Sequence, residues 1–186
     1  MNAIQLMVHE HTYIKRMLAV IRAYCYRILK NQPVDLADFE ELIDFVRSYA
    51  DKHHHGKEEE LLFNKMMAEL GPVAEKLVKH GMLVEHDLGR LHMMELEAAL
   101  KKVAAGDEEA KLDVIANAIS YTHLLTRHID KEDKVAYPFA EKNLAKETIE
   151  KLDQECVQFE QDAEANGLQK KYIDMVEKYE AKLKAM

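Results

Sequence analysis

Apolar side chains recur at intervals of three and four residues along nearly the whole chain of 186 residues. This is the period of an amphipathic α-helix, in which one face is buried. The interruptions are few, at Asn31-Gln32-Pro33, Leu70-Gly71-Pro72, Gly106-Asp107 and Asn166-Gly167. With only 6 Gly and 3 Pro, the chain lacks the frequent turns that an all-β sandwich or barrel needs. The sequence therefore predicts an all-α fold.

Four long helices are expected between these interruptions, over residues 2–30, 35–70, 72–105 and 107–144. Because the connections are short, neighbouring helices must run antiparallel, which gives an up-down-up-down four-helix bundle. Two shorter apolar stripes follow, and they predict a C-terminal helical hairpin packed on the bundle or on a partner subunit. We therefore expect a bundle over residues 1–145 and a hairpin over residues 146–186.

The charge and composition of the chain indicate which partners and which cellular location to expect. The net charge of −8 argues against nucleic acid, because binding to phosphates needs a clustered cationic face. No apolar run approaches the roughly 18 residues that a membrane span requires. The chain begins without the basic and then apolar segments of a secretory signal, and its two cysteines, Cys25 and Cys156, suit a reducing compartment. A cytoplasmic location is expected.

The sequence also contains an internal repeat. The segment from His54 to Phe63 aligns with the segment from His128 to Tyr137 at a shift of 74 residues. At a shift of 75 residues, Glu10-His11 aligns with Glu85-His86. Each half of the chain therefore carries Glu-His and, about forty residues later, His-x-x-x-Glu. A repeat of this kind indicates two helix pairs that present the same side chains.

Four histidines of this repeat are expected to lie at one level of the bundle. Two residues on antiparallel helices share a level when they are equidistant from the turn between them. The midpoints of His11 and His54, of His54 and His86, and of His86 and His128 are 32.5, 70 and 107. All three fall on the turns inferred from Gly and Pro, so the four imidazoles are expected to form one layer.

Two carboxylates join this layer, since Glu58 and Glu132 lie four residues after a histidine and hence on the same helix face. A buried carboxylate is costly unless it is paired, protonated or bound to a metal. Such a donor set suits iron best, with manganese and zinc as alternatives. If each Glu bridges two ions, positions remain for a shared oxo or hydroxo bridge and for an exchangeable ligand, unlike in a closed structural zinc site. The predicted metal ligands are His11, His54, Glu58, His86, His128 and Glu132.

Several neighbouring residues are left open. His53 and His55 flank the predicted ligand of the second helix, and a shift of one residue in register would bring either of them to the metal. His123 is a candidate for an extra ligand or for a residue behind the ligands. Tyr121 lies seven residues before His128 on the same face, where a phenol could act as a redox partner or proton donor or simply pack in the core.

These motifs resemble those of the hemerythrin-like domain, also called the HHE cation-binding domain, and the resemblance covers residues 1–144. The family fold is a four-helix bundle around a non-heme di-iron centre. The resemblance implies that the four histidines of the layer are terminal iron ligands and that the two glutamates bridge. The motifs that carry it are Glu10-His11, His54-x-x-x-Glu58 before Leu62-Phe63, Glu85-His86, and His128-Ile129-x-Lys131-Glu132-Asp133 before Tyr137-Pro138.

The sequence departs from the oxygen-carrying hemerythrins at two points. They have His-x-x-x-His on the third helix, whereas here Arg90 stands four residues after His86. They have His-x-x-x-x-Asp on the fourth helix, where Asp133 has that spacing but Glu132 matches the repeat better. The loss of one imidazole argues against reversible oxygen carriage and favours chemistry on oxygen, peroxide or nitric oxide. Arg90 either supplies a charge beside the site or extends to solvent.

The sequence thus predicts a non-heme di-iron protein that binds or reacts with O2, NO or H2O2, and an oxidoreductase if it is an enzyme. One alternative is a metal-sensing or redox-sensing interaction module in which the state of the centre shifts the packing of the C-terminal helices. Another is an iron storage or delivery protein. Beyond the gas or peroxide ligand, the partners considered are a second copy of the chain and an electron-donor protein.

Overall fold

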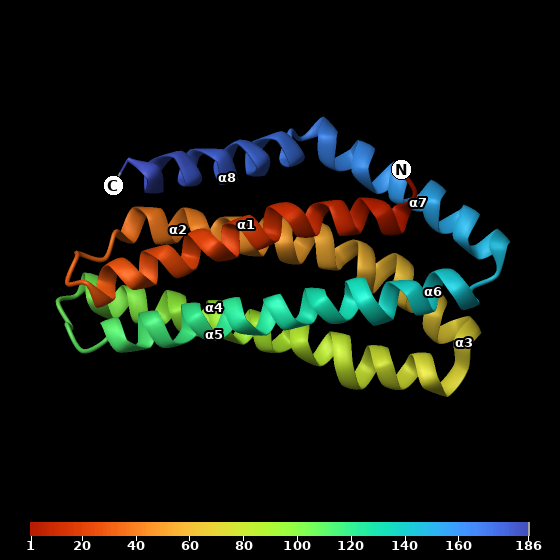
Figure 1. Cartoon of the computed structure of the whole chain (residues 1–186), viewed down its shortest axis with the longest axis horizontal. Coiled ribbons are helices and arrows are strands. Elements are labelled where there is room, and N and C mark those ends of the chain that lie inside the picture. Colours follow the sequence, from red (N-terminus) through yellow and green to blue (C-terminus); the bar gives the residue numbers. More distant parts are fainter. Residues whose placement is uncertain (186) are drawn as a thin grey trace.

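The computed structural model describes residues 1–185, which are largely helical and contain no β-strand (Figure 1). The predicted all-α class is confirmed. The α-helices are α1 (Ala3–Leu29), α2 (Leu36–Phe45), α3 (Phe63–Leu77), α4 (Leu83–Ala104), α5 (Lys111–Lys131), α6 (Tyr137–Asn143), α7 (Lys146–Ala165) and α8 (Leu168–Lys184). Four π-helical segments connect some of them, namely η1 (Val46–His55), η2 (Glu58–Leu62), η3 (Val78–Met82) and η4 (Glu132–Ala136).

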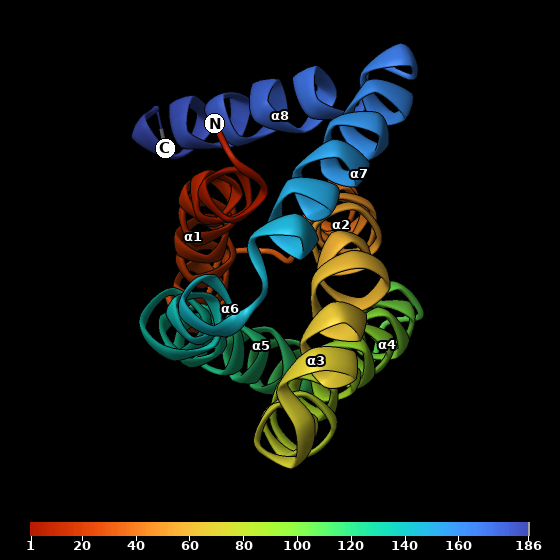
Figure 2. The ribbon, with the colours of Figure 1, turned by 90° about the vertical axis from the view of Figure 1, so that its right-hand side faces the viewer.

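These elements form four long antiparallel rods. The first rod is α1, and the second runs from α2 through η1 and η2 into the first part of α3. The third continues from the rest of α3 through η3 into α4, and the fourth joins α5, η4 and α6. Figure 1 shows the rods side by side, and the end-on view in Figure 2 shows them around a common centre.

The turns between the rods lie at the positions inferred from the sequence. The backbone is left-handed at Asn31 (φ 62°), Gly71 (φ 66°) and Gly106 (φ 93°). A positive φ is favourable for glycine and tolerated by asparagine, so these residues end the helices that precede them. At the start of α2, the side chain of Asp35 accepts a hydrogen bond of 3.1 Å from the backbone of Asp38.

Two apolar clusters fill the bundle, one on each side of the predicted ligand layer. The larger cluster contains residues of α1, α2, α4, α5 and α8, with Phe39, Leu96 and Tyr121 among them. The smaller cluster contains residues near the other end of the bundle, among them Met7 and Phe63. The buried polar side chains between the two clusters are therefore shielded from water on both sides.

The two C-terminal helices do not form the predicted hairpin. They follow one another along the bundle and bend at Gly167, where φ is 65° (Figure 1). The two helices contact each other beside the bend, where Gln169 donates to Glu160, and each buries its apolar stripe against the bundle. Leu152 of α7 joins the smaller apolar cluster and Tyr179 of α8 joins the larger one. The division into units 1–145 and 146–186 stays a prediction.

Within residues 1–185, no helix combines the length and the apolar character that crossing a membrane requires.

Candidate metal centre

The structure brings the four histidines of the layer together in two pairs. His11 Nε2 lies 2.9 Å from His54 Nε2, and His86 Nε2 lies 3.0 Å from His128 Nε2. All four side chains are buried. Two nitrogens that bind one ion at about 2.1 Å and at right angles are about 3 Å apart, so both spacings fit a shared cation.

Two buried carboxylates lie between the imidazole pairs. Glu132 Oε1 is 2.9 Å from His128 Nε2, and its Oε2 is 3.4 Å from His11 Nε2, so this carboxylate reaches both pairs. Glu58 Oε2 is 3.6 Å from His86 Nε2 and 3.8 Å from His54 Nε2. Its other oxygen accepts a hydrogen bond of 2.6 Å from the Tyr137 hydroxyl.

The remaining three oxygens, Glu58 Oε2 and both oxygens of Glu132, are buried and have no hydrogen-bond partner in the described chain. An unpartnered buried polar atom is uncommon and costs free energy. Cations bound between the imidazole pairs would satisfy all three oxygens at once. The residues present therefore fit a dinuclear metal centre.

Local helix geometry helps to aim these side chains. His54 lies in η1, Glu58 begins η2 and Glu132 begins η4. The segments η2 and η4 are related by the 74-residue repeat, so the helix takes its wider π-helical form at the equivalent place in both halves of the chain. π-Helical insertions are frequent at functional sites because they redirect side chains within an otherwise regular helix.

The electrostatics of the two carboxylates differ. Burial, followed by repulsion from Glu132, raises the pKa of Glu58 well above its usual range. Burial alone would raise the pKa of Glu132 as well, but the imidazoles of His128 and His11 hold it well below its usual range. Glu58 therefore holds its proton more strongly than Glu132 does. A metal ion must displace the protons of this layer, so its affinity rises with pH.

Each imidazole is oriented by a carboxylate on its far side. In every case Nδ1 faces a carboxylate oxygen, which leaves Nε2 for the interior of the layer. When Nδ1–H donates to the carboxylate, the lone pair of Nε2 is free to bind a metal. The four contacts join His11 to Asp133 (2.7 Å), His54 to Glu10 (2.8 Å), His86 to Glu59 (2.7 Å) and His128 to Glu85 (2.9 Å).

Each of these carboxylates is in turn paired with a cation. The amine of Lys15 lies 3.1 Å from Asp133, and Arg90 Nη2 lies 2.7 Å from Glu59. Lys57 and Lys131 donate to Glu10 and Glu85 in the same way. Lys57 and Lys131 are related by the repeat, and so are Lys15 and Arg90. The whole arrangement of imidazole, carboxylate and cation is therefore duplicated.

Arg90 holds a place beside the site and does not simply extend to solvent. Its guanidinium also binds Asp51, with Nε–Oδ1 and Nη2–Oδ1 distances of 3.0 and 2.7 Å. Asp51 Oδ1 lies 3.2 Å from Nδ1 of His55. Arg90 thus anchors two carboxylates, and each of them orients an imidazole.

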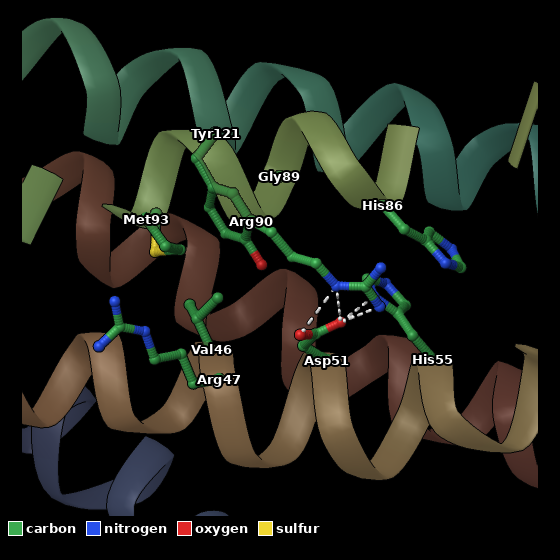
Figure 3. A pocket seen from close by; sticks show the side chains of 9 residues that line it. All are labelled: Val46, Arg47, Asp51, His55, His86, Gly89, Arg90, Met93 and Tyr121. Carbon is green, nitrogen blue, oxygen red and sulfur yellow. Dashed lines mark hydrogen bonds and ion pairs between the residues drawn. The ribbon is translucent and has the colours of Figure 1, made fainter. Parts of the chain in front are cut away.

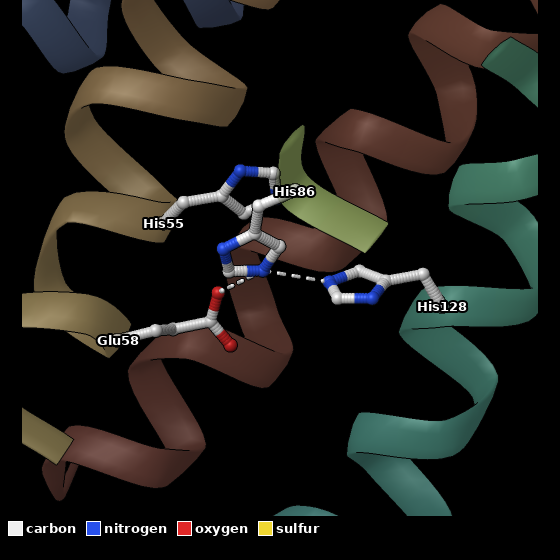
Figure 4. A group of neighbouring side chains, drawn as sticks. All are labelled: His55, Glu58, His86 and His128. Carbon is white, nitrogen blue, oxygen red and sulfur yellow. Dashed lines mark hydrogen bonds and ion pairs between the residues drawn. The ribbon is translucent and has the colours of Figure 1, made fainter. Parts of the chain in front are cut away.

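Of the two histidines that flank His54, only His55 reaches the layer. Its ring stacks on that of His86, with centroids 3.8 Å apart. A donor atom of His55 lies within 4.8 Å of donor atoms of Glu58, His86 and His128 (Figure 4).

His53 points away from the layer, because its Nε2 lies 3.1 Å from Glu160 and 3.0 Å from the amine of Lys57. Asp133 orients His11 from behind. His123 is not part of the group, since its Nε2 faces the guanidinium of Arg22 at 3.3 Å.

A cavity of about 240 Å³ adjoins the centre on the His86 side (Figure 3). His55 and His86 lie at one end of it, and Val46, Met93 and Tyr121 supply most of its apolar wall. The Tyr121 ring packs closely over Gly89 of α4, where a Cβ would stand 3.4 Å from the phenol ring. Tyr121 is therefore both a core residue and a wall of the cavity.

Apart from Arg90 and Asp133, the carboxylates and cations behind the ligands were not identified as functional from the sequence, nor was Tyr137. Their signal was nonetheless present in the repeat. Glu10, Glu59 and Glu85 each stand next to a predicted ligand in the chain, and Lys57 immediately precedes Glu58. Polar residues that a repeat preserves on buried helix faces are expected to be partners of the ligands.

The structure also ties one of these partners to the C-terminal segment. Lys57, whose side chain is 0% exposed, donates to Glu10 and to Glu160 of α7. Its repeat counterpart Lys131 is 50% exposed. Burial would raise the pKa of Glu160, but His53 and Lys57 lower it to about 2. Helix α7 thus covers one half of a duplicated site and leaves the other half open.

Comparison with known proteins agrees with this geometry. The chain is 23% identical over 132 residues to the uncharacterized proteins Rv1995 of Mycobacterium tuberculosis and Mb2018 of Mycobacterium bovis. The matched region is 71% of this chain and 51% of each relative, so the chain spans about half the length of the relatives it matches. Residues 2–140 match the family model of the hemerythrin HHE cation binding domain. The chain therefore belongs to the hemerythrin HHE cation-binding family.

Proposed function

We propose that this chain is a non-heme di-iron protein that binds or reacts with a small diatomic or peroxide ligand, namely O2, NO or H2O2. The observation that carries the proposal is the pairing of buried imidazoles around three carboxylate oxygens that have no other partner. A mixed set of imidazole and carboxylate donors suits iron, and manganese or zinc are the alternatives. When bound, the metal would supply redox and Lewis-acid chemistry.

The side chains around the centre would bind the ions, orient the ligands and exclude water. The pair His11 and His54 would hold one ion and the pair His86 and His128 the other, with Glu132 reaching both pairs. The carboxylates behind the imidazoles fix the ring orientation and keep Nε2 available. The apolar clusters above and below the layer keep bulk water out.

The adjoining cavity supports a small, uncharged ligand. Its volume of about 240 Å³ and its wall of Val46, Met93 and Tyr121 favour molecules without a formal charge. The ion pair of Arg90 with Asp51 lies at the cavity, so an anionic ligand would have to compete with Asp51 for the guanidinium.

An optical experiment tests the proposal. The chain is loaded anaerobically with ferrous iron, desalted, and its spectrum is recorded before and after air is admitted. We expect iron to stay with the protein and a near-ultraviolet charge-transfer absorption of ferric iron to develop. Reversal on removal of oxygen supports ligand binding, and persistence supports a redox reaction. Iron that is lost on desalting, with no new absorption, would refute the proposal.

A second candidate function is a sensor in which the centre controls the C-terminal helices. The observation that favours it is the chain of contacts from His54 through Glu10 and Lys57 to Glu160 of α7. A change of charge at His54 would alter the field on Glu10, and thereby the ion pairs that dock α7.

Limited proteolysis tests this second function. The iron-loaded chain is digested in its reduced and oxidised states, and cleavage near Asn166-Gly167, where α7 meets α8, is measured. A cleavage rate that differs between the two states, without turnover of peroxide or nitric oxide, supports a sensor. Equal rates in both states contradict it.

A further inference from the structure

The two halves of the duplicated centre differ at one aromatic position. Tyr137 and Phe63 correspond to each other in the 74-residue repeat, and both are buried. Tyr137 lies parallel to the ring of His11, with centroids 5.7 Å apart, and Phe63 stacks on the ring of His86 at 6.0 Å. The two rings therefore occupy equivalent places, but only Tyr137 carries a hydroxyl.

This hydroxyl makes the two carboxylates unequal. Tyr137 donates to Glu58 Oε1 at 2.6 Å, so this oxygen would share its lone pairs between the hydrogen bond and a metal, whereas Oε2 accepts no hydrogen bond in the described chain. Phe63 can donate nothing to Glu132, and neither oxygen of Glu132 accepts a hydrogen bond in the described chain, although imidazoles lie within ion-pair distance. An oxygen that accepts a hydrogen bond keeps a second lone pair but is a weaker metal ligand, so Glu58 would offer one weakened oxygen, whereas neither oxygen of Glu132 is weakened in this way.

The donor groups on the two sides are unequal as well. His55, Glu58, His86 and His128, drawn in Figure 4, can bring four donor atoms together, whereas His11, His54 and Glu132 supply three. In the 74-residue repeat His55 corresponds to Ile129, which has no donor atom. Glu132 also lies closer to His128 than to His11, at 2.9 against 3.4 Å.

We propose that the two metal positions have different affinities and fill in a fixed order. The position between His86 and His128 fills first, and the position between His11 and His54 fills second. Tyr137 is a positioning residue that sets this order by holding one oxygen of Glu58. The inference rests on the proposed function, because it requires that the centre bind two ions.

The test is a calorimetric titration of the full chain with ferrous iron under anaerobic conditions. We expect two binding steps whose dissociation constants differ by at least about tenfold, the size of effect that a partner of a ligand typically has. A parallel sample with one equivalent of ⁵⁷Fe should give a single Mössbauer quadrupole doublet, and the second equivalent should add a distinct doublet.

Two variants test the role of the hydroxyl in opposite directions. Tyr137→Phe frees Glu58 Oε1, so the two dissociation constants should converge to within about threefold and the two doublets should become alike. Phe63→Tyr adds a hydroxyl at the equivalent place near Glu132. Since Phe63 packs on His86, this hydroxyl would lie on the side of Glu132 Oε1, the oxygen nearer His128, so the variant should weaken the first step by about tenfold. Far-ultraviolet circular dichroism establishes that each variant is folded.

The outcomes separate the inference from the proposed function. Two ions that bind the unaltered chain in indistinguishable steps would overturn the inference and leave a dinuclear centre intact. Binding of fewer than two ions would overturn the proposed function itself. If Tyr137→Phe keeps the full difference between the two steps, the role assigned to Tyr137 is wrong.

Discussion

Replacing Glu58 by glutamine separates the cost of burying this carboxyl group from its use as a ligand. Glu58 is fully buried, its pKa lies well above the usual range, and Oε1 accepts a hydrogen bond from Tyr137. A neutral carboxyl group and a carboxamide have nearly the same shape, and both can accept that hydrogen bond. Glu58→Gln should therefore change the free energy of unfolding of the metal-free chain by less than about 1 kcal/mol.

The metal-loaded chain should respond very differently. An ion present at a thousand times its dissociation constant stabilises the fold by about 4 kcal/mol. For a chain of this size, that corresponds to a rise in melting temperature of about 8 to 16 °C. Loss of a ligand should weaken a site by at least about a hundredfold, beyond most of what the loss of an outer partner costs. The metal-dependent rise would then shrink to about 3 to 6 °C.

Thermal unfolding followed by circular dichroism at 222 nm, with and without ferrous iron under anaerobic conditions, measures both effects. Glu141→Gln, an exposed position of α6, is the matched control and should behave like the unaltered chain in both conditions. If the free energy of unfolding of the metal-free Glu58→Gln variant falls by more than about 2 kcal/mol, Glu58 is a charged group with a partner in the folded chain. An undiminished metal-dependent rise would show that Glu58 is not a ligand.

Three further outcomes are expected. Arg90→Met should weaken iron binding by about tenfold in competition with a chromophoric chelator, because two orienting carboxylates lose their cation, whereas Lys79→Met on the surface should not. Because the pKa of Glu160 is lowered to about 2 in the folded chain, its ion pair with Lys57 stabilises α7 fully above about pH 4.5 and is lost as the pH falls towards 2. Glu160→Gln should flatten this part of the pH–stability curve, and an unchanged curve would contradict the role of Glu160. His123→Ala should leave the iron stoichiometry unchanged, since His123 faces Arg22 outside the layer, and a reduced stoichiometry would contradict this placement.

Much of the fold follows from two features of the sequence, the residues that end helices and the helical spacing of the apolar residues. Within the described residues 1–185, the backbone has a positive φ at Asn31, Gly71, Gly106 and Gly167, and all four stand in the predicted interruptions. These turns fix the lengths of the rods, and the lengths fix which residues share a level. This is why arithmetic on residue numbers could place four histidines in one layer before any coordinates were known.

The path of the C-terminal helices could not be predicted in this way. The apolar stripes of α7 and α8 show that each helix has a buried face, but a stripe does not say which surface covers it. Here the bundle offered charged partners at the right places, such as Arg16 for Glu180 and Lys65 for Glu155. These contacts depend on three-dimensional placement, and they hold α7 and α8 along the bundle.

The residues that surround the predicted ligands also could not be predicted from the sequence alone. Spacing along a helix identifies residues that face inward, as it did for Glu58 and Glu132. The orientation of an imidazole ring depends on residues from other helices, as with Glu85 behind His128 and Asp133 behind His11. Only the structure joins these distant positions.

The most direct test of the dinuclear centre is a crystal structure of the iron-loaded chain with an anomalous difference map calculated from data at the iron absorption edge. Two peaks are expected, one facing His11 and His54 and the other facing His86 and His128, with Glu132 between them. A single peak, a peak confined to the cluster of His53 and Glu160, or no peak in the layer would contradict a di-iron centre.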